Sequence, residues 1–211
     1  MYRHYFTNWN IFLITAYFFE AFLASALLIV AKRRNYDIWI SASTQHFLGT
    51  FLSIHFAVAG ASAIFITTVN FAVLNPDMEL FNIASHLATS IALIIDLSMN
   101  NIHVHYLEFI CNFTWAAIWL TFIWPIVASD TRGWPYHFLE TEKAKCFLWY
   151  NIMYAFNFLF YSIWWALSRA KFRLLGKDAP EVDFDAILRK ENDSYSSCDA
   201  YSYMVLDSTN R

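Results

Sequence analysis

The sequence predicts an all-α integral membrane protein, a helical bundle with about five transmembrane helices. Of its 211 residues, 58% are hydrophobic and 20% aromatic, whereas only 15% are charged, a balance unlike that of soluble domains. Five apolar segments reach the roughly 20 residues that a helix needs to cross a hydrocarbon core about 30 Å thick. No segment alternates apolar and polar residues as the strands of a barrel do, so we expect helices.

The expected spans follow one another through residues 1–175, which we expect to form one transmembrane helical domain. They are Trp9–Ala31, Phe47–Leu74, Leu80–Met99, Tyr106–Ala128 and Cys146–Leu167. Residues 176–211 are polar, acidic and rich in Ser and Tyr, without a helical apolar pattern. Such a composition is typical of disorder, and the sequence predicts a mostly disordered tail.

The first span predicts the orientation of the chain. It is followed by Lys32, Arg33 and Arg34, and further basic residues follow the last span. Because positively charged loops stay on the cytosolic side, we expect an N-terminus outside the cell or in the lumen and a cytosolic C-terminal tail. The first apolar run is too long for the core of a cleaved signal peptide. The sequence therefore predicts a retained anchor in the plasma membrane or the endoplasmic reticulum.

Glu20 in the first span and His55 in the second are ionisable groups on helices that a short basic loop makes antiparallel neighbours. A hydrogen bond or ion pair between them is the expected structural role. A proton path is the alternative, which a proton-coupled transporter using Glu20, His55 and Asp96 would require. Such a transporter has less support, because five spans give no inverted repeat.

The third span carries polar side chains along one face. On a helix at about 100° per residue these side chains fall within an arc of roughly 140°. They are Asn82, Ser85, His86, Thr89, Ser90 and Asp96. The remaining surface is apolar, so we expect the polar face to point into the bundle and the other face toward lipid. His86 lies about 9 Å below the outer end, at 1.5 Å per residue, and either bonds locally or serves a function.

The end of the third span and the last two spans carry residues with expected structural roles. Asp96 lies near the inner end of the third span, where it can reach headgroups or cap the helix. His103 and His105 follow in a loop. Trp164 and Trp165 lie near the inner end of the last span, and we expect interfacial aromatic anchors there.

The common enzyme signatures are absent from the sequence. It has no G-x-S-x-G elbow, H-E-x-x-H zinc helix, phosphate-binding glycine loop or dinucleotide fingerprint. Its three cysteines show neither a disulfide framework nor metal spacing. A haem between His55 and His86 is disfavoured because the two lie at different depths. We therefore expect no metal and no cofactor, and no nucleic-acid partner. Membrane lipids are the expected partners, and protein partners stay open.

Three stretches resemble the androgen-induced and rolling-stone family of multi-pass membrane proteins. The first is His4-Tyr-Phe-Thr-Asn-Trp9, which opens a span; the second is Ser85-His86 followed ten residues later by Asp96. The third, residues 133–140 with the sequence GWPYHFLE, resembles the family's late loop of aromatic, proline, leucine and acidic residues. The resemblance covers residues 3–175 and implies a multi-span helical fold.

In the androgen-induced branch, the resemblance implies a threonine hydrolase acting on fatty acid esters of hydroxy fatty acids. The matching positions are Thr7 as nucleophile and His86 as general base. Asn8 and Asn82 are candidate donors to the oxyanion. Without the resemblance, Thr7 would be interpreted as a helix cap. The rolling-stone branch implies the alternative, a non-catalytic membrane protein that acts in cell fusion, adhesion or signalling.

Overall fold

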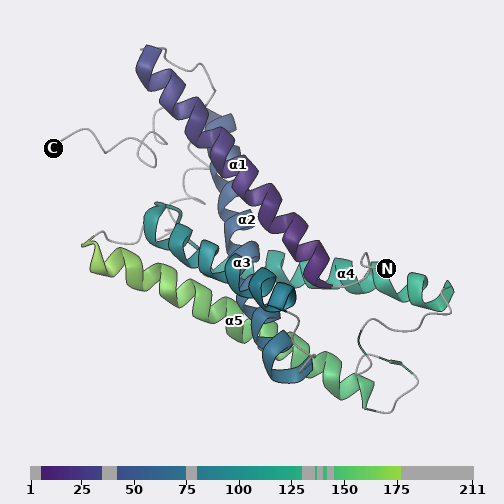
Figure 1. The fold of residues 1–211 in the computed structure, drawn as a ribbon. Coiled ribbons are helices and arrows are strands. Elements are labelled where there is room, and N and C mark those ends of the chain that lie inside the picture. Colours follow the sequence, from purple (N-terminus) through teal and green to yellow (C-terminus); the bar gives the residue numbers. More distant parts are fainter. Residues whose placement is uncertain are drawn as a thin grey trace, which may run out of the picture.

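The computed structural model describes residues 6–34, 42–74, 80–129, 136, 140–141 and 145–176 (Figure 1). The elements are α1 (Phe6–Arg34), α2 (Ala42–Val69), the π-helical turn η1 (Asn70–Leu74), α3 (Leu80–Met99), the 3₁₀ turn η2 (Tyr106–Glu108), α4 (Phe109–Ser129) and α5 (Cys146–Leu174). The described part of the chain contains no strand, which confirms the all-helical fold class. The predicted disordered tail beyond Gly176 lies outside the described residues.

Three of the helical segments are long and apolar enough to cross a membrane. They are Phe6–Val30, Phe47–Ala72 and Tyr106–Ile126. The apolar part of α3, Ala84–Met99, is shorter than a full span, and α5 does not meet the same criterion. Tyr, Trp and Asn side chains along α5 make it less apolar than its length suggests. These three helices support a membrane location for the chain, whereas the count of five spans stays a prediction.

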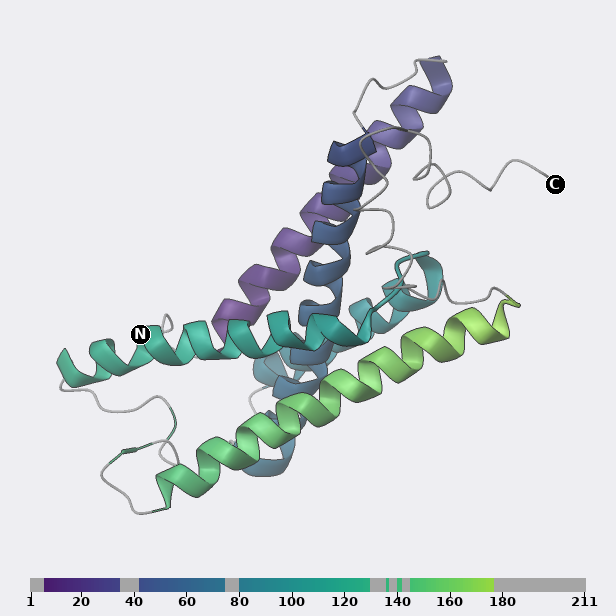
Figure 2. The ribbon, with the colours of Figure 1, turned by 180° about the vertical axis from the view of Figure 1, so that it is seen from behind.

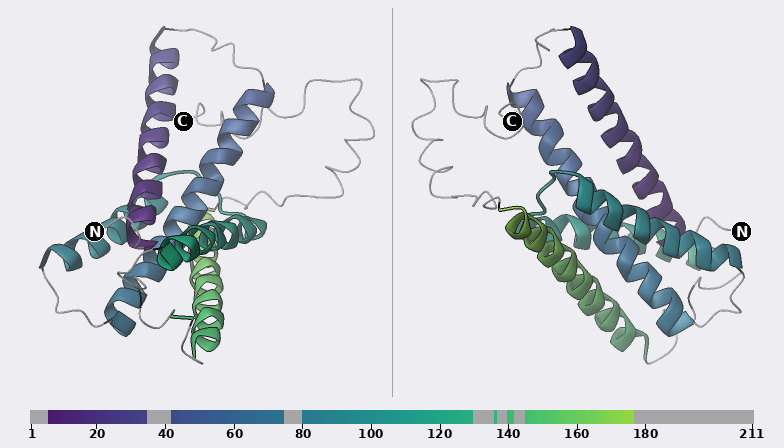
Figure 3. Two further views of the ribbon diagram at one scale, coloured as in Figure 1. Left: turned by 90° about the vertical axis from the view of Figure 1, so that its right-hand side faces the viewer. Right: turned by 60° about the vertical axis from the view of Figure 1, so that its left-hand side comes forward.

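Helix α2 lies at the centre of the molecule and packs against α1, α3, α4 and α5 (Figure 1). Seen from behind, α4 and α5 run obliquely across α2 (Figure 2). Helices α1 and α2 separate toward the C-terminal end of α1 (Figure 3). About two thirds of the apolar window of α2 is buried, against 17% for α1 and for α4. The outer helices thus keep most of their apolar surface free for lipid.

Small side chains in the middle of α2 allow helices to approach it from several directions. Five of the seven residues 57–63 are Ala or Gly, and small residues let helix backbones come close in membranes. At Gly60 the approach is closest, because a Cβ built there would lie 2.0 Å from Cε2 of Trp164 on α5. Trp164 is 0% exposed. Its expected role as an interfacial anchor is therefore wrong, since its ring fills the space above Gly60.

Helix α3 points its polar face into the bundle, as its sequence predicts. His86 and Ser90 are buried, whereas Leu87, Ile91 and Ile95 are exposed. The buried face also carries Leu93 and Leu97, which join the core of α1, α2 and α5. The amphipathic pattern alone was sufficient to orient this helix.

Replacement of Gly60 by alanine tests the α2–α5 contact. The added methyl group overlaps the Trp164 ring, and overpacking of this kind costs about 1–3 kcal/mol or more. We expect Gly60→Ala to lower the thermal unfolding temperature of the detergent-solubilised protein. Gly49→Ala is the matched control on the same helix, because a Cβ added there would have nothing within 4 Å. Equal unfolding temperatures for the two variants would contradict the close approach.

Candidate functional site

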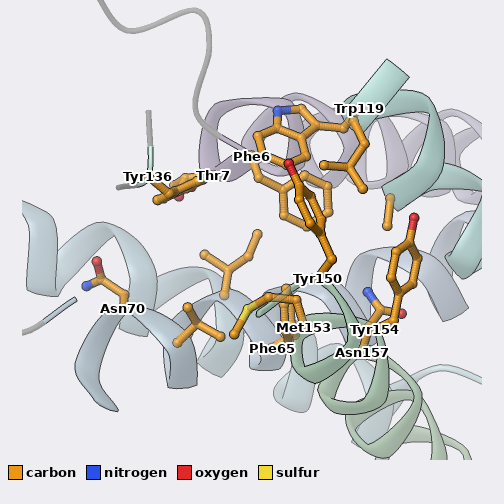
Figure 4. A pocket seen from close by; sticks show the side chains of 14 residues that line it. Phe6, Thr7, Phe65, Asn70, Trp119, Tyr136, Tyr150, Met153, Tyr154 and Asn157 are labelled. Atoms are coloured by element: carbon orange, nitrogen blue, oxygen red, sulfur yellow. The ribbon is translucent and has the colours of Figure 1, made fainter. Parts of the chain in front are cut away.

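A cavity of about 80 Å³ lies between α1, α2, α4 and α5 (Figure 4). Its walls are mostly aromatic and aliphatic. The lining side chains are Phe6, Thr7, Phe65, Ile66, Val69, Asn70, Ala116, Trp119, Leu120, Tyr136, Tyr150, Met153, Tyr154 and Asn157. Figure 4 shows Asn70 and Thr7 on one side of the cavity and Asn157 and Tyr154 on the other. The cavity is thus an apolar chamber with a few polar groups at two opposite ends, the general form of a small-molecule site.

Thr7 is the second residue of α1 and lines this cavity. The preceding residue, Phe6, is buried against Phe65 and Trp119, so aromatic packing fixes the start of α1 on the cavity wall. The residue before α1 lies outside the described residues, so the interpretation of Thr7 as a helix cap stays a prediction. Thr7 lies on the wall of an apolar cavity.

Asn70 is one of the polar residues of the cavity that were not predicted from the sequence, with Tyr150, Tyr154 and Asn157. It is the first residue of η1, where α2 changes from α-helical to π-helical geometry; π-helical turns occur frequently at functional sites. Asn70 is 5% exposed, and its Nδ2 has no hydrogen-bond partner in the described structure. A buried amide without a partner is costly, so it is suited to donate to a ligand. The available signal was a carboxamide near the end of a predicted span.

The opposite end of the cavity contains a chain of hydrogen bonds between three helices. Ser62 Oγ on α2 donates to Asn112 Oδ1 on α4 at 3.1 Å, and Asn112 Nδ2 donates to Asn157 Oδ1 on α5 at 2.6 Å. All three side chains are buried. Because these groups satisfy one another away from water, they fix the relative positions of the three helices that form the cavity.

His86 does not line the cavity. Its side chain is 5% exposed, on α3, and its carbonyl oxygen accepts hydrogen bonds from Thr67 Oγ1 at 2.9 Å and Thr89 Oγ1 at 3.0 Å. Thr67 also bonds to Ser90 at 2.8 Å. No hydrogen bond joins the Thr7 hydroxyl to the His86 ring in the described structure. Asn70 follows Thr67 by three residues and hence by about one turn of α2, so His86 is bonded to α2 about one turn away from the residue that lines the cavity with Thr7.

The two candidate oxyanion donors lie near the same end of the bundle as the predicted catalytic pair. Asn8 is half-buried on α1 and does not line the cavity. Asn82 lies in the first turn of α3, and its side chain falls outside the described part of the structure. Asn70, unlike these two asparagines, is seen to line the cavity, on the same side as Thr7.

The remaining predicted polar residues lie elsewhere in the bundle. The expected pair is present, with His55 Nδ1 at 2.7 Å from Glu20 Oε2. Asp96 neither caps α3 nor reaches outward. Its carboxylate instead accepts hydrogen bonds from the Tyr17 hydroxyl at 2.5 Å and from Asn100 Nδ2 at 3.0 Å. These pairs join α1 to α2 and α1 to α3, and none of their members lines the cavity. Within the described residues, no group of three His, Cys, Asp or Glu side chains is placed to hold a metal.

Replacing Asn112, the middle member of the Ser62–Asn112–Asn157 chain, tests its contribution to stability. Asn112→Leu removes two hydrogen bonds and leaves buried polar groups on α2 and α5 unpaired, which costs about 1–3 kcal/mol. We expect a lower unfolding temperature than for Asn151→Leu. Asn151 is an exposed residue of α5 whose amide bonds only locally, to the Phe147 carbonyl at 2.7 Å. If Asn112→Leu were as stable as the control, the chain of hydrogen bonds would have no role in holding the helices together.

No protein-family model matches the chain, and neither a curated protein nor a solved structure shows significant similarity to it. The resemblance to the androgen-induced and rolling-stone family therefore stays a prediction from its short motifs. The cavity, with Thr7 and Asn70 at one end, is the site on which a function can be argued.

Proposed function

We propose that this protein is a membrane lipid-binding protein that accommodates part of an acyl chain in the Thr7 cavity and binds the adjoining carbonyl group with Asn70. The observation that carries the proposal is the unpartnered Nδ2 of Asn70, a buried residue that lines the apolar cavity. Three apolar helical segments long enough to cross a membrane support access from the bilayer.

The size of the cavity limits what it can hold. A water-sized group needs about 10–15 Å³ on the same measure of volume, so about 80 Å³ holds roughly six such groups. A methylene group is similar in size to a water molecule. The cavity therefore accommodates a segment of about six methylenes, and the remainder of a long chain would extend along the lipid-facing helices.

The polar end of the cavity determines which lipid is favoured. An acyl chain that enters the cavity from the bilayer moves between two equally apolar surroundings. Burial of the acyl chain therefore gives little selectivity between lipids. A hydrogen bond from Asn70 Nδ2 to a lipid carbonyl satisfies an otherwise unpaired amide, which is worth about 1–3 kcal/mol. Esters and free acids of long-chain lipids are favoured over hydrocarbons of equal length for this reason.

Hydrolysis of a bound ester by Thr7 and His86 is the second candidate function, and the position of Thr7 on the cavity wall favours it. The Thr7 oxygen would attack the ester carbonyl, the alcohol would leave with a proton from the base, and water would release the acid. Proton transfer needs His86 within about 3 Å of the hydroxyl or joined to it by one water. The two side chains are not hydrogen-bonded in the described structure, so this function requires a shift of α3 or a bridging water.

Binding is tested by titrating the detergent-solubilised protein with a fluorescent fatty acid ester. We expect Asn70→Leu to weaken binding about tenfold, because the carbonyl loses its donor, whereas Asn151→Leu on exposed α5 surface has no effect. Val69→Trp should also weaken binding by filling the cavity, whereas Ile91→Trp on the exposed face of α3 should not. Unchanged affinity in both cavity variants would exclude this cavity as the lipid site.

Catalysis is tested separately, with a fluorophosphonate probe and a fatty acid ester of a hydroxy fatty acid. The hydrolase function requires labelling that disappears in Thr7→Ala and ester turnover that falls at least about a hundredfold in His86→Ala, as for loss of a general base. Thr7→Ser should retain labelling, since it keeps the hydroxyl. If the wild-type protein binds the ester but neither reacts with the probe nor hydrolyses the ester, lipid binding is its function without catalysis. This result would favour the resemblance to the non-catalytic rolling-stone branch.

A further inference from the structure

A cluster of basic side chains lies at the C-terminal ends of α3 and α5, away from the cavity. Its members are His103 and His105 in the segment between α3 and η2, and Arg169 and Lys171 in α5. The ring centroids of His103 and His105 lie 4.9 Å apart. The Arg169 guanidinium lies 5.3 Å from the Trp165 ring, and the Lys171 ammonium 4.5 Å from the Phe172 ring.

The segment that carries the two histidines is irregular but firmly held. Ser53 Oγ on α2 donates to the His103 carbonyl at 2.9 Å, and the Tyr161 hydroxyl on α5 donates to the His105 carbonyl at 2.6 Å. Between them, the Val104 amide donates to Ser168 Oγ at 3.2 Å. These bonds to α2 and α5 fix residues 103–105, so His103 is positioned before any ligand arrives.

Two side chains of this cluster carry buried nitrogens without a partner. Both ring nitrogens of His103 and Nε of Arg169 are buried without a hydrogen bond in the described structure. Burial lowers the pKa of His103 to about 4, and electrostatic repulsion from His105, Arg169 and Lys171 adds to this effect. Neutral His103 and charged Arg169 thus lie together in a positive, partly desolvated site, where an anion would supply the missing acceptor.

We propose that His103, Arg169 and Lys171 form a binding site for the phosphate group of an anionic phospholipid. Lys171 lies close enough to His103 to act on it electrostatically, and its Nζ donates hydrogen bonds to the carbonyl and side-chain oxygens of Asn100, at 3.0 and 3.1 Å. Phosphate oxygens accept hydrogen bonds from Arg, Lys and His, and these bonds are stronger when they are charge-assisted.

The surroundings favour a lipid as the source of the phosphate. Leu167 and Leu174 share a helical face with Lys171 by their spacing of four and three residues. Both leucines are exposed, at 43% and 88%, so an acyl chain can lie on α5 beside the basic cluster. The cluster also lies at the end of α5 that the charge pattern places on the cytosolic side, where anionic lipids are concentrated. A free phosphate ion would use the basic side chains but not the leucines.

Titration of the full-length, detergent-solubilised protein with dihexanoylphosphatidylglycerol tests the proposal. We expect saturable binding of one lipid, weakened at least about tenfold in Arg169→Gln through loss of a charge-assisted hydrogen bond. Arg173→Gln is the matched control, because it removes the same charge from an exposed position on the same helix, and it should change affinity less than about twofold. Equal weakening by the two variants would show diffuse surface attraction and overturn the proposal.

Two further measurements distinguish the site from simpler explanations. Inorganic phosphate should bind at least about tenfold more weakly than the lipid, and equal affinity would overturn the assignment to a lipid. Arg169→Lys keeps the charge and should retain most of the binding, and monodisperse elution of each variant shows that folding is preserved. The opposite pattern would contradict a role for the charge: a normally folded Arg169→Lys variant that does not bind the lipid, and an Arg169→Gln variant that binds it fully.

The pH dependence of binding provides a readout specific to His103. An anion favours the protonated ring, so the pKa of His103 rises above about 4 when the lipid binds. Linkage then requires affinity to increase as pH falls toward that value, while the phosphodiester keeps its single charge. Glu108 is a further titratable group against this segment, since its carboxylate accepts hydrogen bonds from the His105 amide at 3.1 Å and from Ser53 Oγ at 2.8 Å. His103→Asn should abolish the increase, whereas Glu108→Gln should leave it in place. An increase of the same size in the His103 variant would remove His103 from the site.

Discussion

The contact between Gly60 and Trp164 determines how the remaining helices can pack. Because α2 has no side chain at Gly60, the Trp164 ring reaches its backbone and α5 crosses the centre of the molecule. The same crossing brings Asn157 on α5 next to Asn112 on α4 and forms one wall of the cavity. In a membrane, where lipid is as apolar as the helix surfaces, such close packing and the polar bonds that it permits are the main forces between helices.

The described buried polar groups differ in whether their hydrogen bonds are satisfied. At the centre, the Ser62–Asn112–Asn157 chain and the Glu20–His55 pair satisfy their members by contacts between helices. Asn70 in the cavity and His103 with Arg169 in the basic cluster have buried nitrogens without a partner, as do Asn10 and Trp164. Complete pairing is typical of buried polar groups, whereas each buried unpaired donor needs a specific explanation, of which a missing ligand is one.

Much of the fold could be predicted from the sequence, because helix lengths and the orientation of α3 depend on local apolar patterns. The Glu20–His55 pair was also predictable, since a short loop joins the two helices. Trp164 and Asp96 were misassigned, because their partners Gly60 and Tyr17 lie on helices far away in the sequence. Asn70 was missed for a related reason: its environment depends on how α1, α2, α4 and α5 meet, and on a π-helical turn that apolar periodicity does not reveal.

The position of α3 determines whether the cavity can support catalysis. Thr67 on α2 holds the His86 carbonyl and the Ser90 hydroxyl, and so fixes the register of α3 against α2. A shift of α3 that carried His86 toward Thr7 would break these two bonds, at a cost of about 0.5–1.5 kcal/mol each. A lipid carbonyl bonded to Asn70 could offset that cost, because it removes an unsatisfied buried amide. Any catalytic arrangement of Thr7 and His86 is therefore expected in the lipid-bound state rather than in the empty one.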